Sequence, residues 1–190
     1  MPDDLGRFSV VMVCTGNICR SPAAERLAAL SWGDPSTLVV SSVGVRAMVG
    51  EPISLPMAHL LESHGAYSGE FAARQVSPAL LRDADLVLGM TRRHRRAVLE
   101  VFPAATRRTF TLREFARLAA ASEHDLPDAD GQEPLAALVS AAVQHRGPLT
   151  DPAADDIRDP YGHEADVYEE AFEAIRESVD TVAGVLRRVT

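Results

Sequence analysis

The sequence contains no lysine, and all 19 of its basic residues are arginines. This absence excludes Schiff-base catalysis, which requires a lysine amine, and the P-loop NTPase motif, whose lysine contacts the terminal phosphates. Cysteine is scarce as well: Cys14 and Cys19 are the only two, too few for a disulfide framework or a four-thiolate zinc site. The chain also lacks His-Glu-x-x-His, Gly-x-Ser-x-Gly and Gly-x-Gly-x-x-Gly, the signatures of zinc proteases, serine hydrolases and dinucleotide-binding domains.

The composition is that of one ordinary globular domain. The 190 residues are 46% hydrophobic and 24% charged, and this length matches one domain of roughly 100–200 residues. No apolar run approaches the roughly 18 residues of a membrane span, and the acidic opening Met-Pro-Asp-Asp is unlike a signal peptide. The net charge of -8 argues against nucleic-acid binding, which requires a basic surface. We therefore expect a single cytoplasmic domain over residues 1–190, without nucleic-acid or membrane partners.

Strand-like and helix-like segments alternate along the chain. Strands are predicted at residues 8–13, 38–42, 85–90 and 108–112, and helices from Ser21 onward, at 55–64, at 91–101 and along 167–186. Ser21 is expected to cap a helix whose first position is Pro22. Such alternation predicts an α/β fold with a parallel sheet covered by helices on both faces. Ligands of these sheets bind at the carboxyl ends of the strands, and Cys14 lies at one such end.

One acidic stretch interrupts this alternation. Residues 122–156 hold eight of the 27 acidic residues and a single arginine, Arg146. Its middle, residues 135–143, is apolar enough to form a short helix. The simpler interpretation is a solvated surface insertion, and the alternative is a lid or partner surface near the functional site.

The segment between the first strand and the first helix places Arg20 six positions after Cys14. The loop between them can curl so that its backbone N–H groups point inward and form an anion-binding concavity. The helix N-terminus adds positive dipole charge, and the guanidinium can hold two phosphate oxygens. Because the same environment favours a thiolate, Cys14 is predicted to attack phosphorus. Cys14 alone would be interpreted as a small buried apolar residue, but the combination favours catalysis.

The run Val-Cys-Thr-Gly-Asn-Ile-Cys-Arg-Ser-Pro, residues 13–22, resembles the signature loop of the low-molecular-weight protein tyrosine phosphatases. The resemblance continues through residues 41–44, 73–75, 85–90 and 159–161, and omits the acidic stretch. It implies a single three-layer domain with a four-stranded parallel sheet in the flavodoxin-like order 2-1-3-4. It also implies a phosphotyrosine phosphatase that forms a phosphocysteine intermediate without a cofactor or metal. Its substrates would be phosphotyrosyl proteins, a bacterial tyrosine kinase is a candidate partner, and phosphate, sulfate, vanadate or arsenate would bind its site.

The resemblance also assigns roles to individual residues. The phosphate-binding loop would comprise Cys14, Thr15, Gly16, Asn17, Ile18, Cys19, Arg20 and Ser21. Within it, Asn17 would hold the loop shape and Ser21 would stabilise the thiolate. Cys19 either packs beneath the loop or forms a reversible disulfide with Cys14 under oxidation. The walls around the substrate would be Met48, Val49 and Tyr161.

A leaving phenolate benefits from a proton donor, and three Asp-Pro pairs could supply one. Asp34 lies where a turn is a sufficient explanation, and Asp151 lies within the acidic stretch. Asp159 precedes Pro-Tyr and the last predicted helix, an arrangement similar to the acid loop of the family. We therefore predict that Asp159 is the general acid and base, with Asp151 as a distant second candidate.

Alternative functions on the same fold are less consistent with the sequence. Relatives that act on phosphoarginine carry Thr where this chain has Ile18, so the apolar side chain favours an aromatic substrate. Arsenate reduction requires cysteines beyond Cys19, and a silent phosphotyrosine-binding module would be expected to lack the nucleophile or the acid.

Three further features depart from the family or stay open. Phe71 stands where many members carry a supporting His, and Thr91 stands where others carry an acid. The basic run at residues 92–96 is interpreted as a solvated helix face, with a dock for acidic substrates as the alternative.

Overall fold

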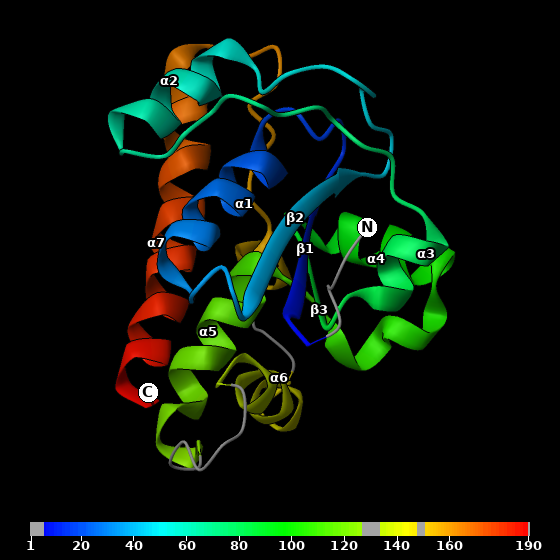
Figure 1. Cartoon of the computed structure of the whole chain (residues 1–190), viewed down its shortest axis with the longest axis vertical. Coiled ribbons are helices and arrows are strands. Elements are labelled where there is room, and N and C mark those ends of the chain that lie inside the picture. Colours follow the sequence, from blue (N-terminus) through cyan, green and yellow to red (C-terminus); the bar gives the residue numbers. More distant parts are fainter. Residues whose placement is uncertain (1–5, 127–133, 148–150, 190) are drawn as a thin grey trace.

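A computed structural model describes residues 6–126, 134–147 and 151–189 of the chain. Four parallel strands form its centre. In spatial order they are β2 (Leu38–Gly44), β1 (Phe8–Cys14), β3 (Leu86–Gly89) and β4 (Thr109–Thr111) (Figure 1). The predicted α/β domain with strand order 2-1-3-4 is confirmed. β1 is paired on both sides and nearly all buried, as its apolar run predicts for a central parallel strand.

Helices cover both faces of the sheet (Figure 1). On one face lie α1 (Arg20–Ser31), α2 (Leu55–Ser63), α5 (Leu112–Ser122) and α7 (Ala165–Val189), and on the other α3 (Pro78–Asp83) and α4 (Arg92–Val101). The larger apolar cluster contains Met12, Phe110 and Phe172, and the smaller one, towards α3 and α4, contains Val11 and Val87. No helix in the described part of the chain is long and apolar enough to cross a bilayer.

Two predicted boundaries are corrected by hydrogen bonds at helix starts. Residue 112 was expected in a strand, but Thr111 and Glu114 form a reciprocal capping box that starts α5 there. At α1, Cys19 rather than Ser21 occupies the capping position. The hydroxyl of Ser21 donates instead to the sulfur of Cys14, so this side chain serves the loop and not the helix end.

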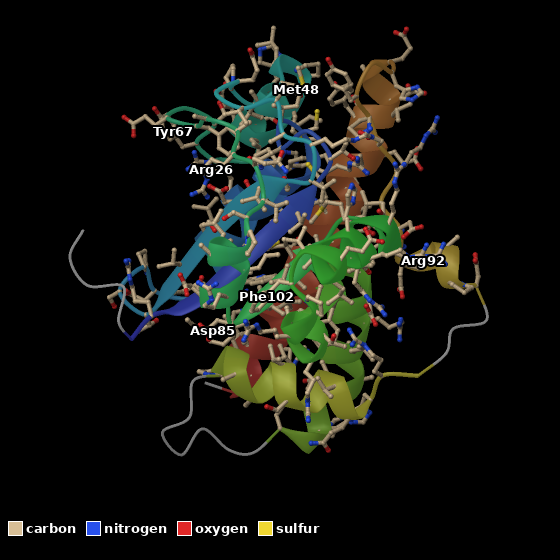
Figure 2. All side chains as sticks on the ribbon, turned by 90° about the vertical axis from the view of Figure 1, so that its right-hand side faces the viewer. Arg26, Met48, Tyr67, Asp85, Arg92 and Phe102 are labelled. Atoms are coloured by element: carbon tan, nitrogen blue, oxygen red, sulfur yellow. The ribbon has the colours of Figure 1, made fainter. Side chains whose placement is uncertain are left out.

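The acidic stretch contains a packed helix, α6 (Pro134–Gln144), as its apolar middle predicts. Leu135 and Leu138 are buried in the main core, so this part is not simply a solvated insertion. Just after the helix, the guanidinium of Arg146 lies over the ring of Phe110, 4.0 Å from its centroid. The Nε of Arg146 donates a hydrogen bond of 2.9 Å to the carboxylate of Glu114. In Figures 1 and 2, α6 lies at the end of the sheet opposite Met48, and it therefore forms no lid over the carboxyl ends of the strands.

Short 3-10 helices complete the described chain. They span Pro103–Arg108, Glu123–Asp125 and Pro152–Asp155. The remaining parts of the acidic stretch, residues 127–133 and 148–150, lie outside the described residues.

Candidate active site

The loop between β1 and α1 wraps around the sulfur of Cys14. The backbone N–H of Asn17 donates to this sulfur over 3.2 Å, and the hydroxyl of Ser21 donates over 3.0 Å. Asn17 adopts a left-handed conformation with φ 58°, which asparagine tolerates better than most residues and which turns the chain back over the sulfur. Two donors aimed at one sulfur stabilise negative charge on it.

The carboxamide of Asn17 connects the loop to two other segments. Its nitrogen donates to the hydroxyls of Ser21 (2.9 Å) and Ser42 (2.8 Å), and its oxygen accepts from the backbone N–H of Arg74 (2.7 Å). Asn17 is fully buried, so these bonds compete little with water. The geometry supports the predicted role of Asn17 in holding the loop shape. Phe71, at the position of the family's His, lies 5.9 Å beneath the guanidinium of Arg26 instead.

A second loop, residues 45–50 (the wall loop), is bonded to the first through the main chain. The N–H groups of residues 45, 46 and 48 donate to the carbonyls of residues 14, 15 and 16 over 3.0, 3.0 and 2.9 Å. Gly44 permits this approach, since a Cβ atom there would lie 2.5 Å from the carbonyl oxygen of Thr15. The two loops are therefore held as one unit.

The guanidinium of Arg20 is buried and aimed by two partners. Nη1 donates to the carbonyl of Ile157 over 2.9 Å, and Nη2 forms an ion pair with Asp159 at 2.6 Å. Its Nε is buried and finds no hydrogen-bond partner among the residues that the structure describes. Because a buried guanidinium nitrogen is costly to leave unpaired, Arg20 retains a donor suited to the oxygen of a bound anion.

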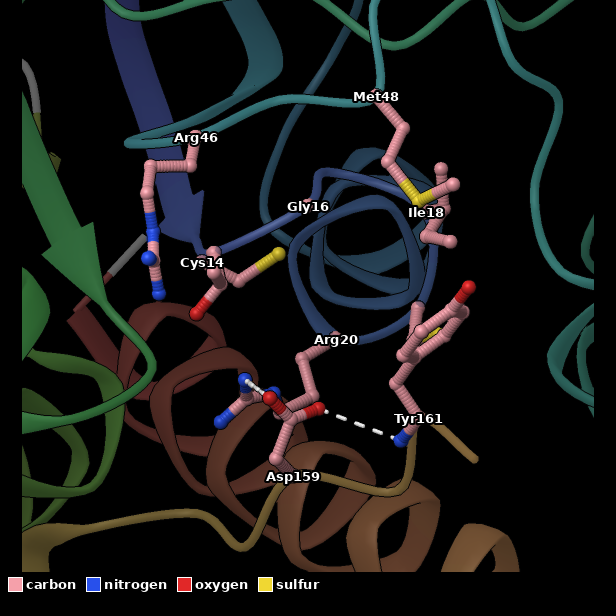
Figure 3. A pocket seen from close by; sticks show the side chains of 10 residues that line it. Cys14, Gly16, Ile18, Arg20, Arg46, Met48, Asp159 and Tyr161 are labelled. Atoms are coloured by element: carbon pink, nitrogen blue, oxygen red, sulfur yellow. Dashed lines mark hydrogen bonds and ion pairs between the residues drawn. The ribbon is translucent and has the colours of Figure 1, made fainter. Parts of the chain in front are cut away.

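The geometry separates the three Asp-Pro carboxylates. Asp34 accepts from the N–H of Ser36 within a turn, and Asp151 accepts from the N–H of Ala153 at the start of a 3-10 helix. Asp159 alone of the three lines the cavity that contains Cys14. Its side chain is 49% exposed and lies between Arg20 and the N–H of Tyr161 (Figure 3).

The cavity has a volume of about 330 Å³. It is lined by Cys14, Thr15, Gly16, Ile18, Cys19, Arg20, Arg46, Met48, Asp159 and Tyr161. Ile18, Met48 and Tyr161 lie on one side of the Cys14 sulfur and Arg46 on the other (Figure 3). Among the described residues, no three His, Cys, Asp or Glu side chains are grouped to hold a metal ion.

The wall loop places its side chains differently around the cavity. Val49, predicted as a wall residue, is 70% exposed and is not among the lining residues, whereas the neighbouring Met48 lines the cavity. Arg46 lines the cavity although sequence reasoning did not single it out. No motif marked it, since its position depends on the main-chain bonds between the two loops.

His94 supports the phosphate-binding loop from α4, and sequence reasoning missed this role too. It is buried, and its ring nitrogens lie 2.9 Å from the hydroxyls of Thr15 and Thr91. Burial, aided by the positive charge of Arg20, lowers the pKa of His94 to about 4. The ring is therefore neutral near pH 7, donating at one nitrogen and accepting at the other. Thr91, in place of the family's acid, also caps α4 by accepting from the N–H of His94.

The rest of the basic run divides into paired and unpaired arginines. Arg92 forms an ion pair with Asp156 and Arg95 with Glu114, each at 3.1 Å. Arg93 and Arg96 are exposed. The run is therefore not one uniform solvated face.

Cys19 is a free, buried thiol within the loop. Its sulfur lies 3.1 Å from the hydroxyl of Ser54 and 3.9 Å from that of Tyr168. Burial raises the pKa of Cys19, so this thiol stays protonated near pH 7. Pairing of Cys19 with Cys14 under oxidation stays a prediction.

Known proteins share this fold and sequence pattern. The family model described as low molecular weight phosphotyrosine protein phosphatase matches residues 9–134. The low molecular weight protein-tyrosine-phosphatase Wzb of Salmonella typhi is 40% identical over 94 residues, which cover 50% of this chain and 61% of Wzb. The probable low molecular weight protein-tyrosine-phosphatase EpsP of Ralstonia solanacearum is 30% identical over 139 residues, which cover 73% of this chain and 90% of EpsP.

A solved structure matches most of the chain. The YwlE arginine phosphatase of Geobacillus stearothermophilus superimposes with a TM-score of 0.69 at 27% identity, covering 95% of this chain and 94% of YwlE. The fold, the loop around Cys14 and these matches lead to one conclusion: the chain belongs to the low molecular weight phosphotyrosine protein phosphatase family.

Proposed function

We propose that this protein hydrolyses phosphotyrosine in proteins through a phosphocysteine intermediate. The observation that carries the proposal is the convergence of Cys14, Arg20 and Asp159 on one cavity at the carboxyl end of β1. A nucleophile, a fixed cation and an acid are the groups that phosphoryl transfer to a thiol requires. Family membership supports the same conclusion.

In the first step, the thiolate of Cys14 attacks phosphorus in line with the tyrosine oxygen. The S–P bond forms as the P–O bond to the phenol breaks, and the protonated carboxyl of Asp159 gives its proton to the leaving oxygen. Arg20 and the backbone N–H groups of the loop hold the remaining phosphate oxygens, where negative charge accumulates in the transition state.

In the second step, water replaces the phenol. The Asp159 carboxylate accepts a proton from water while the water oxygen attacks phosphorus, and the S–P bond breaks to release inorganic phosphate and the thiolate. One carboxyl group thus acts first as acid and then as base. The exposed position of Asp159 at the cavity mouth allows both the phenol and water to reach it.

The cavity walls favour an aromatic substrate. Ile18, Met48 and the ring of Tyr161 face the space beside the sulfur (Figure 3), and apolar and aromatic groups pack well on a tyrosine ring. The apolar side chain of Ile18 offers no acceptor to the N–H groups of a phosphoarginine. A phosphotyrosyl protein is therefore the substrate we expect, and a bacterial tyrosine kinase as its partner stays a prediction.

The test compares variants on aryl phosphates with good and poor leaving groups. Cys14→Ser should abolish turnover of phenyl phosphate and of dinitrophenyl phosphate. Asp159→Asn should lower kcat for phenyl phosphate by about 10²- to 10⁴-fold, but much less for dinitrophenyl phosphate, whose phenolate leaves without a proton. Asp151→Asn is the matched control, because Asp151 precedes proline equally and caps a turn instead.

Two results would overturn the proposal. One is turnover by Cys14→Ser at the parental rate. The other is a preference for phosphoarginine peptides over phosphotyrosine peptides of the same sequence, which would reassign the substrate while leaving the mechanism in place. Vanadate should compete with substrate in the parent protein.

A further inference from the structure

A second cavity adjoins the first behind Thr15 and Arg46. It has a volume of about 370 Å³, and both residues line it as well as the first cavity. Its other side is formed by α4, which contributes Arg93, Arg96 and Glu100. We call this second cavity the arginine groove. Because Arg46 borders both spaces, the groove continues directly from the site of the proposed reaction.

The arginines of this groove are available to a ligand. Arg46, Arg93 and Arg96 are exposed, and within the described ranges 6–126, 134–147 and 151–189 no carboxylate forms an ion pair with them. By contrast, the flanking Arg92 and Arg95 are both paired. Three unpaired guanidinium groups therefore face one carboxylate, that of Glu100.

This concentration of positive charge stands out on an acidic protein. The net charge of the chain is -8, yet the described lining of the groove holds three arginines and one glutamate. His94 also lines the groove, and burial, which lowers its pKa, keeps its ring neutral near pH 7, so that it adds no charge there. The groove is thus a local positive region whose sign is opposite to that of the whole chain.

We propose that the arginine groove binds acidic side chains that flank the phosphotyrosine of the substrate protein. The inference rests on the proposed phosphatase function and adds a preference for substrate sequence. Aspartate and glutamate carboxylates match the guanidinium fork. A phosphotyrosine ring beside Met48 and Tyr161 leaves the Arg46 side of the cavity open to the adjoining peptide (Figure 3), and that side leads into the groove.

The test uses phosphotyrosine peptides that differ only in charge. One peptide carries three glutamates before the phosphotyrosine, one carries them after it, and a third carries glutamines at both sets of positions. For the parent protein, kcat/KM for at least one acidic peptide should exceed that of the glutamine peptide by about three- to tenfold at low salt. This preference should vanish at roughly 1 M salt, where the screening length is about 3 Å.

The double variant Arg93→Ala/Arg96→Ala should lose the preference and keep the parental rates on phenyl phosphate and on the glutamine peptide. Arg82→Ala/Arg107→Ala is the matched control: it removes two exposed arginines that precede β3 and β4, at the far end of the sheet. It should retain the preference. Charge reversal in Arg93→Glu/Arg96→Glu should make the acidic peptides poorer substrates than the glutamine peptide.

The outcomes separate the two proposals. No hydrolysis of any aryl phosphate by the parent protein would refute the phosphatase function. Hydrolysis of all three peptides at equal rates would refute the role of the groove alone. An acidic preference that survives in Arg93→Ala/Arg96→Ala, or that disappears equally in the control variant, would also refute it.

Discussion

Replacing His94 by glutamine should make the stability of the protein less sensitive to acid. The substitution removes a titrating ring from behind the phosphate-binding loop and leaves an amide nitrogen that can still reach the hydroxyl of Thr15. In the unfolded chain, His94 takes up a proton as the pH falls through about 6.5. In the folded protein it does so only near pH 4. Between these values the unfolded state binds one more proton, so acid favours unfolding.

The magnitude follows from the two pKa values. Each pH unit between 6.5 and about 4 changes the free energy of unfolding by about 1.4 kcal/mol, which gives a total of about 3 kcal/mol. The parent protein should therefore lose about 3 kcal/mol relative to His94→Gln as the pH falls from 7 to 4. The loss of free energy of unfolding caused by His94 is absent well above pH 6.5 and complete well below pH 4.

Urea denaturation of both proteins at several pH values between 7 and 4 measures this difference. Other groups titrate in both proteins and cancel, except those that interact with His94 directly. Asp159 is the acid with the largest such effect, so the comparison is repeated in an Asp159→Asn background. A free-energy difference between parent and variant that stays constant from pH 7 to pH 4 would refute the lowered pKa of His94.

Three further predictions concern the loop. Asn17→Ala should lower the free energy of unfolding by about 2–5 kcal/mol, since buried groups lose hydrogen bonds to its side chain; urea denaturation measures this, and a loss below about 1 kcal/mol contradicts the role. Gly44→Ala should destabilise by about 1–3 kcal/mol and reduce kcat, because the new Cβ must displace the carbonyl of Thr15; unchanged kinetics would show that the loop tolerates the shift. If Cys14 and Cys19 pair under mild peroxide, intact-mass measurement should show a product that is two hydrogens lighter and is reversed by thiol. In Cys19→Ser, which cannot form this disulfide, Cys14 should instead be oxidised irreversibly to sulfinic and sulfonic acid. Sulfonic acid in the parent protein would reject the pairing.

Local patterns predicted the parts of the fold and site that are contiguous in sequence. The apolar run of β1, the turn residues after it and the following helix determine the position of Cys14 and Arg20. Alternating strands and helices predicted the parallel sheet, and the apolar middle of the acidic stretch predicted α6. The helix α5 was missed although its capping box, Thr111 with Glu114, is visible in the sequence.

What the sequence did not predict depends on contacts between distant segments. His94 meets Thr15 across 79 positions, and its place in a run of arginines concealed its burial. Ser21 has the sequence environment of a helix cap, but the nearby sulfur of Cys14 takes its hydroxyl. Arg46 lines the cavity and Val49 does not, because main-chain bonds between two loops determine which side chains turn inward.

Those main-chain bonds have a consequence for substitution. The peptide N–H groups of residues 45, 46 and 48 hold the phosphate-binding loop by main-chain hydrogen bonds. The side chains at these positions can therefore change without breaking those bonds. Residue 48 lines the cavity beside Ile18 and Tyr161, and residue 46 lines both this cavity and the arginine groove. Substitutions at these two positions would therefore change the groups that line the cavities, while the main-chain bonds that hold the phosphate-binding loop would be kept.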